Sequence, residues 1–283
     1  MQTLVFTDLD GTLLDHHNYS FEPAKAQLNE LREQGIPLIC NTSKTFAELL
    51  PLREKLGNHA PFITENGAGV YLPLHFLPER AIHRLGNASL QHGYWRFGLS
   101  HPRSYWQMLL AQAKAFHGLY ASFQQMGSKG IAQTTGLSAE AAALANQREF
   151  SEPLLWLGDN QSKRTFAEHM HQMGAKVVEG GRFLHIVGNS DKGKALRWLA
   201  GVYEYKNKLP TCTLAAGDGA NDAPMLQAAD HALVVRSPVN PPPEVPNHPS
   251  MIISEAPGPA GWAPGIAQLL ARVARAHSEC SAQ

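Results

Sequence analysis

The chain has 283 residues, of which 43% are hydrophobic and 17% are charged. This composition is typical of a globular protein with a sizeable core and argues against a disordered chain. The 24 Lys and Arg residues balance the 24 Asp and Glu residues. Because no basic excess would attract nucleic acid or an acidic membrane, we expect neither of them as a partner.

The N-terminus and the cysteines both indicate the cytoplasm. No basic segment followed by a long apolar run opens the chain, so we expect no signal peptide. No apolar stretch reaches the length of a membrane span. Cys40, Cys212 and Cys280 are far apart and odd in number, which argues against a disulfide framework. The first two lie in apolar, strand-like runs, so we expect small core residues there.

Short apolar runs alternate with helical patterns towards both ends of the chain. This alternation predicts an α/β fold: a doubly wound, mostly parallel sheet (a Rossmann-like core) with helices on both faces. Helices are expected over residues 22–34, with Gly35 as a stop, and from about Lys44, where Pro51 should kink or split the helix. The expected strands of this part are residues 3–6, 36–40, 62–64, 69–72, 211–216 and 232–235.

The middle of the chain follows a different pattern, which predicts an inserted α+β cap domain. We expect the cap at residues 85–187 and the core at residues 1–84 and 188–283. Residues 237–265 hold nine of the nineteen prolines. Because Ile252 and Trp262 offer apolar anchors, we expect an irregular strap on the core, then a last helix from about Gly265 to His277. The cap elements expected are helices 104–116 and 161–173 and strands 153–158, 176–178 and 183–187.

Two carboxylates follow the first expected strand, in the stretch LVFTDLDGTLLD (residues 4–15). In an open parallel sheet, ligands bind beyond the carboxyl ends of the strands. Asp8 and Asp10 are too close for both to ionise without a cation, so one can serve as a nucleophile and the other as a general acid. The alternative is a simple Asp10-Gly11 turn, which does not explain a buried charge at Asp8.

Three further strand ends carry polar residues, and each has a structural alternative. In CNTSKT, Thr42 suits a phosphate, whereas Thr42 or Ser43 could instead cap the next helix. In NSDKGKAL, Lys192 could hold a phosphoryl group or be a surface charge behind a capping Asp191. In AAGDGANDAPML, Asp218 and Asp222 could bind Mg²⁺ beside a phosphate. The alternative is a glycine-rich turn that binds no ligand.

In this order, DLDGT, a hydroxyl residue, Lys-Gly and GDGAND resemble the motifs of the haloacid dehalogenase superfamily, whose members use an aspartate nucleophile to hydrolyse phosphate esters. The resemblance implies that Asp8 forms an aspartyl-phosphate and that Asp10 acts as acid and base. It also implies that Thr42, with Ser43 as a stand-in, binds phosphate, and that Lys192 steadies phosphate and nucleophile.

The resemblance also implies Mg²⁺ as the cofactor. Asp8, the backbone carbonyl of Asp10, and Asp218 match the metal ligands of the superfamily, and Asp222 matches a supporting acid beside the metal. The cation would offset the repulsion between the carboxylates and the phosphate dianion, and phosphoryl transfer depends mainly on positioning and charge stabilisation.

A narrower likeness extends over nearly the whole chain. It is carried by the stretches FTDLDGTLLDHHNYSFEPA, NTSKT, FITENGAGVYLP, REFSEPLLW, GRFLHI and GPAGW, which are similar to those of the mannosyl-3-phosphoglycerate phosphatases. The likeness implies hydrolysis of a small phosphorylated sugar metabolite to mannosylglycerate. It does not distinguish this substrate from glucosyl-3-phosphoglycerate or a hexose phosphate. A phosphomutase and a non-catalytic binding protein are the alternatives from other functional classes.

Four residues are expected to contact the substrate beyond its phosphate, together with Ser43 as a possible phosphate contact. Lys44 and Asn66, in the ENGA turn, would line the pocket from the core. Arg148 and Ser151, in the segment REFSEP, would reach it from the cap. For REFSEP the alternative is a structural loop that an Arg–Glu pair closes before a strand.

Overall fold

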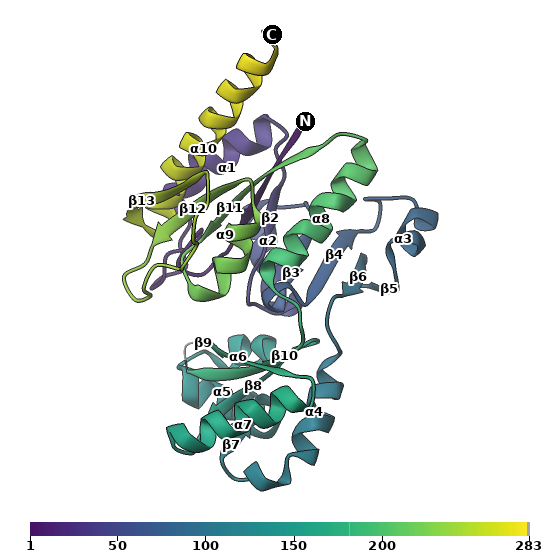
Figure 1. Ribbon diagram of the computed structural model, residues 1–283, viewed down its shortest axis with the longest axis vertical. Coiled ribbons are helices and arrows are strands. Elements are labelled where there is room, and N and C mark those ends of the chain that lie inside the picture. Colours follow the sequence, from purple (N-terminus) through teal and green to yellow (C-terminus); the bar gives the residue numbers. More distant parts are fainter. Residues whose placement is uncertain (181, 282–283) are drawn as a thin grey trace.

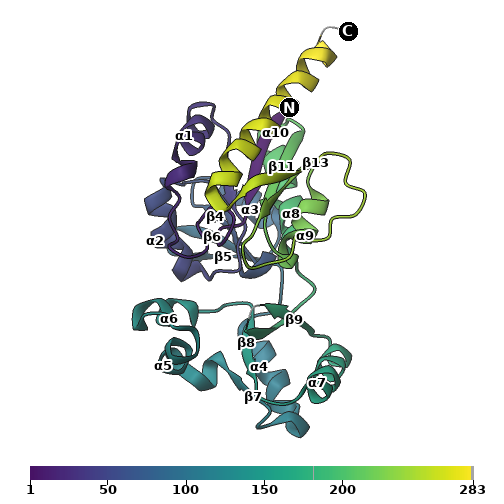
Figure 2. The same cartoon turned by 90° about the vertical axis from the view of Figure 1, so that its left-hand side faces the viewer.

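The computed structural model describes residues 1–180 and 182–281, and it has two lobes that lie one above the other (Figures 1 and 2). The larger lobe holds a five-stranded, all-parallel sheet in the order β13-β12-β11-β1-β2. This confirms the predicted α/β core. Its strands are β1 (Gln2–Thr7), β2 (Leu38–Cys40), β11 (Thr211–Gly217), β12 (His231–Arg236) and β13 (Met251–Pro257).

Helices cover both faces of this sheet because its strands are apolar on both sides. Leu4 and Phe6 of β1 belong to the apolar cluster beneath α8, whereas Val5 points to the opposite cluster, which contains Trp262 of α10. Figure 2 shows α1 on one side of the sheet and α8 and α9 on the other. The helices around this sheet are α1 (Lys25–Glu33, preceded by a 3₁₀ turn at Glu22–Ala24), α2 (Phe46–Leu56), α8 (Lys192–Asn207), α9 (Ala223–Ala228) and α10 (Gly258–Ser281).

A second, antiparallel sheet extends the larger lobe in the order β3-β4-β6-β5. The strands expected at 62–64 and 69–72 are present, but they pair antiparallel with each other, and β3 meets the end of the parallel sheet through an isolated parallel bridge between Asn41 and Ile63. β5 and β6 lie within the predicted cap range, yet their ladders tie them to β4, so we place the first boundary after Gly98. The elements are β3 (Phe62–Thr64), β4 (Gly69–Pro73), α3 (Glu79–Leu85), β5 (Ala88–Gln91) and β6 (Tyr94–Gly98).

The smaller lobe is an antiparallel sheet in the order β7-β8-β10-β9, with α4 and α7 on the side away from the core (Figure 1). α6 lies towards the core, where its Leu144 carbonyl accepts a hydrogen bond from the Thr45 hydroxyl at 3.0 Å. Trp106 of α4 and Phe166 of α7 pack under Leu184 and Ile186 of β10. The expected helices and strands of the cap are present, while β7, α5 and α6 were not predicted. The elements are α4 (Arg103–Gln112), a 3₁₀ turn (Lys114–Phe116), β7 (Tyr120–Ser122), α5 (Phe123–Thr135), α6 (Ala139–Ala145), β8 (Glu152–Trp156), α7 (Asn160–Gln172), β9 (Lys176–Gly180) and β10 (Phe183–Val187).

Two expectations about proline were wrong. Pro51 lies inside α2, which nevertheless runs without interruption from Phe46 to Leu56 and opens with a full capping box between Thr45 and Glu48. The Pro-rich strap is irregular only before Met251; β13 and the first turns of α10 follow within it. Trp262 is fully buried, so it does anchor this segment, as expected.

The two cysteines whose side chains are described, Cys40 and Cys212, are buried and free, as expected for small core residues. The side chain of Cys280 lies outside the described part of the structure. Among the described residues, no helix combines the length and the apolar character needed to cross a bilayer.

Candidate active site

The predicted polar residues meet at one edge of the parallel sheet, beyond the carboxyl ends of β1, β2 and β11. Asp8 follows β1, Thr42 follows β2, and Asp218 follows β11. Lys192 is the first residue of α8, which packs on one face of the sheet. Parallel strands end at the same edge, so residues separated by more than 200 positions in the sequence become neighbours.

A buried lysine lies between two carboxylates at the centre of this site. The Lys192 ammonium is 2.8 Å from Asp8 Oδ1 and 2.6 Å from Asp222 Oδ1. Both Lys192 and Asp222 are fully buried. Asp222 also accepts hydrogen bonds from the backbone N–H groups of Asp218 and Gly219, at 3.1 and 3.0 Å. Lys192 is therefore not a surface charge, and that alternative is wrong.

The acids of the site outnumber its buried cation. Asp8, Asp218 and Asp222 are buried, and one oxygen of each lies within 4.8 Å of the others. Desolvation, followed by the charge of Asp222, raises the pKa of Asp8 to about 8 although Lys192 acts in the opposite direction. Burial and Asp222 also raise the pKa of Asp218. One ammonium cannot balance three carboxylates, so the cluster favours either an extra proton or a further cation.

The donor set fits a small divalent cation. Carboxylate oxygens are the preferred ligands of Mg²⁺. Asp218 is already oriented by hydrogen bonds from Thr12 Oγ1 (3.0 Å) and Asn240 Nδ2 (3.1 Å). Asp10 Oδ1 is buried and, among the described residues, has no hydrogen-bond partner. A dication would balance the net negative charge that remains when Lys192 is set against the three carboxylates. The buried residues able to hold it are Asp8 and Asp218, with Asp222 beside them.

Asp10 has an ion-pair partner of its own, the Lys44 ammonium. Its Oδ2 lies 2.8 Å from the Lys44 ammonium. Although burial alone would lower it, the charge of Asp10 and that of Glu48 leave the pKa of Lys44 above its ordinary value. The ammonium also lies 5.3 Å from the centre of the exposed Tyr19 ring. The acid/base candidate and the lysine expected to bind substrate are therefore direct partners.

The helix-capping alternative for Thr42 and Ser43 is wrong, because Thr45 is the N-cap of α2. Thr42 is buried, and its hydroxyl accepts a hydrogen bond from the backbone N–H of Lys44 at 3.2 Å. The Ser43 carbonyl accepts from Arg148 of the cap at 2.8 Å. The Thr42 hydroxyl is therefore not used as a helix cap, while the backbone N–H of Thr42 itself donates to the Ile63 carbonyl at 3.1 Å.

The REFSEP segment leads into a strand, as its structural alternative expected, but among the described residues no Arg–Glu pair within the segment closes it: its two glutamates pair with Arg96 and Arg103 instead. Ser151 is almost fully buried, and its hydroxyl donates to Glu65 of the core at 2.5 Å. The same carboxylate accepts from the backbone N–H groups of Glu149 (2.7 Å) and Phe150 (3.2 Å). These contacts tie the cap to the core, and they occupy the Ser151 hydroxyl that was expected to contact substrate.

The ENGA turn contacts both the loop that follows β11, through Asn221, and the start of α8. Asn66 has a left-handed backbone (φ 58°), and its side-chain oxygen accepts from Asn221 Nδ2 at 3.2 Å. Asp191 caps α8 by accepting from the Lys194 N–H at 2.7 Å, so the capping role considered for Asp191 is confirmed. Asn66 thus lies at the rim of the site, in line with its expected place in the pocket.

Two supporting residues of the site were not found from the sequence. Asn240, in the Pro-rich segment, reaches Asp218 although no local pattern distinguishes it from other loop residues. Asn41 donates to the Lys192 carbonyl at 3.0 Å and so positions the first residue of α8. Its place directly after the second strand, beside Thr42, is a signal that could have identified it.

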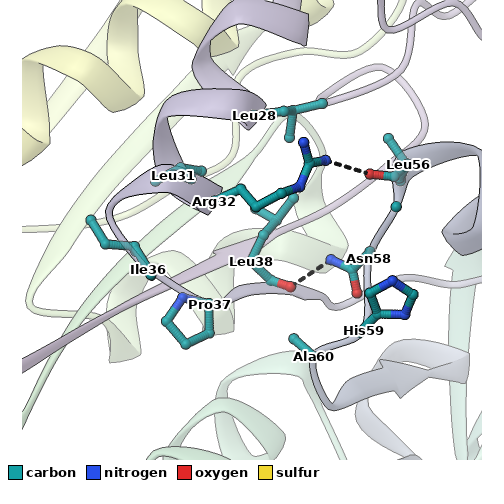
Figure 3. Close-up of a pocket in the computed structure, with 12 residues that line it drawn as sticks. Leu28, Leu31, Arg32, Ile36, Pro37, Leu38, Leu56, Asn58, His59 and Ala60 are labelled. Atoms are coloured by element: carbon teal, nitrogen blue, oxygen red, sulfur yellow. Dashed lines mark hydrogen bonds between the residues drawn. The ribbon is translucent and has the colours of Figure 1, made fainter.

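A separate cavity of about 260 Å³ lies at the opposite, amino-terminal end of the sheet (Figure 3). It opens between the ends of α1 and α2, where Arg32 donates to the Leu56 carbonyl and Asn58 donates to that of Leu38. Among the described residues that line it, none is a carboxylate. It lacks the reactive groups gathered at the other edge and is not the active site.

Comparisons with known proteins agree with this geometry. Residues 5–92 match the family model of haloacid dehalogenase-like hydrolases, and residues 163–253 match that of sucrose-6F-phosphate phosphohydrolases. A Methanococcoides burtonii protein named glucosyl-3-phosphoglycerate/mannosyl-3-phosphoglycerate phosphatase is 36% identical over 280 residues, which cover 96% of this chain and 98% of the relative.

Solved structures share the fold at lower identity. A Thermotoga maritima protein superposes with a TM-score of 0.64 at 19% identity, covering 96% of this chain and 97% of its own. The sucrose-phosphatase of Synechocystis, solved with sucrose and phosphate, has a TM-score of 0.59 at 14% identity, with coverages of 94% and 97%. The relative that is 36% identical and the matching family model together show that the chain belongs to the haloacid dehalogenase-like hydrolases and is a phosphoric monoester hydrolase.

Proposed function

We propose that the chain is a Mg²⁺-dependent phosphatase that acts on a glycosyl-3-phosphoglycerate through an aspartyl-phosphate. Mannosyl-3-phosphoglycerate is the expected substrate and mannosylglycerate the product. The observation that carries the proposal is the buried cluster of Asp8, Asp218 and Asp222 around Lys192. The relative's name, which contains both the glucosyl and the mannosyl ester, supports this substrate class.

In the proposed mechanism, each residue has a role that matches its surroundings. Asp8, Asp218 and the backbone carbonyl of Asp10 would hold Mg²⁺, with Asp222 in support; the bound cation supplies positive charge beside the transferred phosphoryl group. Lys192 orients the attacking oxygen of Asp8 through its 2.8 Å contact. Thr42 donates its hydroxyl to a non-bridging phosphate oxygen.

The reaction then proceeds in two displacements at phosphorus. An Asp8 carboxylate oxygen forms a bond to phosphorus while the bond to the glycerate oxygen breaks, and Asp10 gives its proton to that leaving oxygen. Asp10 next removes a proton from water, which attacks the phosphorus and releases inorganic phosphate and the free Asp8 carboxylate. Splitting one hydrolysis into two steps lowers each barrier. Lys44, at 2.8 Å, keeps Asp10 in place between its two roles.

A parallel assay of phosphate release tests the proposal. Mannosyl-3-phosphoglycerate, glucosyl-3-phosphoglycerate and simple hexose phosphates are compared with and without Mg²⁺. We expect the glycosyl-phosphoglycerates to be preferred and Mg²⁺ to be required. Equal rates on all esters would remove the narrow substrate, and a shifted rather than released phosphate would identify a phosphomutase.

The nucleophile is tested by Asp8→Asn, which should lower phosphate release by about a thousandfold or more, as removal of a covalent nucleophile does. Asp159→Asn is a matched control, because Asp159 is a surface N-cap of α7 in the cap. Full activity of the Asp8 variant would refute the covalent mechanism.

A further inference from the structure

A second cavity, also of about 260 Å³, lies between the two lobes beside the catalytic lysine. Core residues Asn66, Lys192 and Asn221 form one wall, and Lys176 and His185 of the cap belong to the other. The cavity therefore extends from the start of α8, where Lys192 and the helix cap Asp191 line it, to the cap sheet. A group bonded to the transferred phosphate would enter it.

Strand alternation determines which cap side chains face this cavity. In β9, Val177 packs with the helix-side cluster, so Lys176 and Val178 point the other way, towards the core. In β10, Leu184 and Ile186 are in the same helix-side cluster. Lys176 thus reaches the cavity from the open face of the cap sheet.

The ammonium of Lys176, which lines this cavity, lies next to a second ammonium, that of Lys194, which is not among the lining residues. Lys176 Nζ and Lys194 Nζ donate to the same oxygen, Asn189 Oδ1, at 2.7 and 2.8 Å. Lys194 has a carboxylate partner, Asp191, at 3.3 Å. In the described part of the chain, Lys176 meets no carboxylate within ion-pair distance; its neighbour is a neutral amide. An anion placed in the cavity would relieve the repulsion between the two cations.

We infer that Lys176 determines specificity by receiving the carboxylate of the phosphoglycerate part of the substrate. This inference rests on the proposed function, because a phosphoglycerate ester carries a second anion that a simple sugar phosphate lacks. Lys192 and Mg²⁺ serve the phosphate, Lys44 is paired with Asp10, and Arg148 donates to the Ser43 carbonyl. Neither Lys44 nor Arg148 lines this cavity, whereas Lys176 lines it from the cap and is placed to receive the carboxylate. The amides of Asn66 and Asn221 lie between them, where substrate hydroxyls would pass.

The test compares Lys176→Met and Lys176→Arg with the unaltered chain in Mg²⁺. Substrates are mannosyl-3-phosphoglycerate and p-nitrophenyl phosphate, which has no carboxylate. We expect Lys176→Met to lower kcat/KM for the first by about tenfold to a hundredfold, mainly through KM, as loss of a charged hydrogen bond does. Hydrolysis of p-nitrophenyl phosphate should stay within about twofold, and Lys176→Arg should restore most of the loss.

A second measurement does not depend on turnover of the natural ester. In the unaltered chain, 3-phosphoglycerate should inhibit p-nitrophenyl phosphate hydrolysis more strongly than glycerol 3-phosphate, which lacks the carboxylate. Lys176→Met should abolish this difference. Lys163→Met is the matched control, because Lys163 pairs with Glu179 on the opposite face of the same sheet at 2.8 Å and should leave both readouts unchanged.

The outcomes separate the two claims. If the unaltered chain prefers the carboxylate esters and Lys176→Met keeps that preference, the inference is overturned while the proposed function stands. If the unaltered chain shows no preference for carboxylate esters, the glycosyl-phosphoglycerate function falls and the inference falls with it. Loss of the preference in Lys176→Met alone supports both.

Discussion

Gly11, in the motif that follows β1, lies so close to Asp218, in the motif that follows β11, that no other residue type fits at position 11. A β-carbon at Gly11 would lie 2.6 Å from Asp218 Oδ2, and the backbone of Gly11 is left-handed at φ 78°. The Gly of DLDGT is therefore required by its contact with the Asp218 carboxylate as well as by its turn.

We expect Gly11→Ala to displace Asp218 and to lower both Mg²⁺ affinity and phosphate release by at least about tenfold, as disturbing a metal ligand does. Calorimetric titration with Mg²⁺ and a phosphate-release assay measure these effects. Gly35→Ala is the control: it shares the left-handed backbone (φ 64°) but has open space around its β-carbon. It should cost about 1 kcal/mol of stability and leave activity unchanged. Equal activity losses in both variants would refute the contact argument.

Lys192 should contribute to stability as well as to catalysis. Lys192→Met leaves the buried Asp222 carboxylate, and Asp8 whenever it is ionised, without their shared cation, so we expect a loss of about 3–5 kcal/mol in the free energy of unfolding. Urea unfolding in a metal chelator at neutral pH measures it. Lys25→Met, which removes an exposed pair with Glu22, should cost less than about 1 kcal/mol. A stable Lys192→Met protein would show that the pair is not needed for folding.

The raised pKa of Asp8 predicts how stability depends on pH without metal. Its pKa is about 8 in the folded chain against an ordinary value of 3.8. The folded state therefore binds a proton that the unfolded state releases, so this contribution to stability falls as pH rises from about 4 to about 8 and is constant above that. Thermal unfolding in a chelator across this range measures the fall, and Asp8→Asn should reduce it.

Mg²⁺ should counteract this fall, because it favours the ionised carboxylate. At a concentration about a hundred times its dissociation constant, a ligand of the folded state adds about 2.7 kcal/mol. We therefore expect the rise in unfolding temperature on adding Mg²⁺ to be larger near pH 8 than near pH 5, where Asp8 holds its proton. A rise that is the same at both pH values in the unaltered chain would contradict this assignment.

Glu65 should hold the cap linker against the core. Its buried carboxylate accepts from two backbone N–H groups and the Ser151 hydroxyl. In Glu65→Gln an amide N–H₂ would face these donors, so we expect a loss of about 1–3 kcal/mol and faster hydrogen exchange at Glu149 and Phe150. Glu168→Gln, on the exposed side of α7, is the control. Unchanged exchange at these two amides would show that the linker is held by other contacts.

Local patterns along the sequence were sufficient for most of the core. Strands and helices appear where apolar periodicity predicts them, because that periodicity reflects which face each element buries. The positions of Asp8, Lys192 and Asp218 at the ends of parallel strands or the start of a helix were enough to predict that they meet. The start of α2 was harder to predict. Its N-cap is Thr45 rather than Thr42 or Ser43, since several neighbouring hydroxyl residues could serve as the cap.

By itself, the sequence determined the class of fold and which charged residues gather at one edge of the sheet, since strand ends of a parallel sheet share one edge. Only the tertiary structure decided that Ser151 bonds to Glu65, that Asn240 reaches Asp218 and that Lys176 faces the cavity. The reason is physical: these contacts join loops or lobes that are distant in the chain, and their geometry depends on how the whole molecule packs.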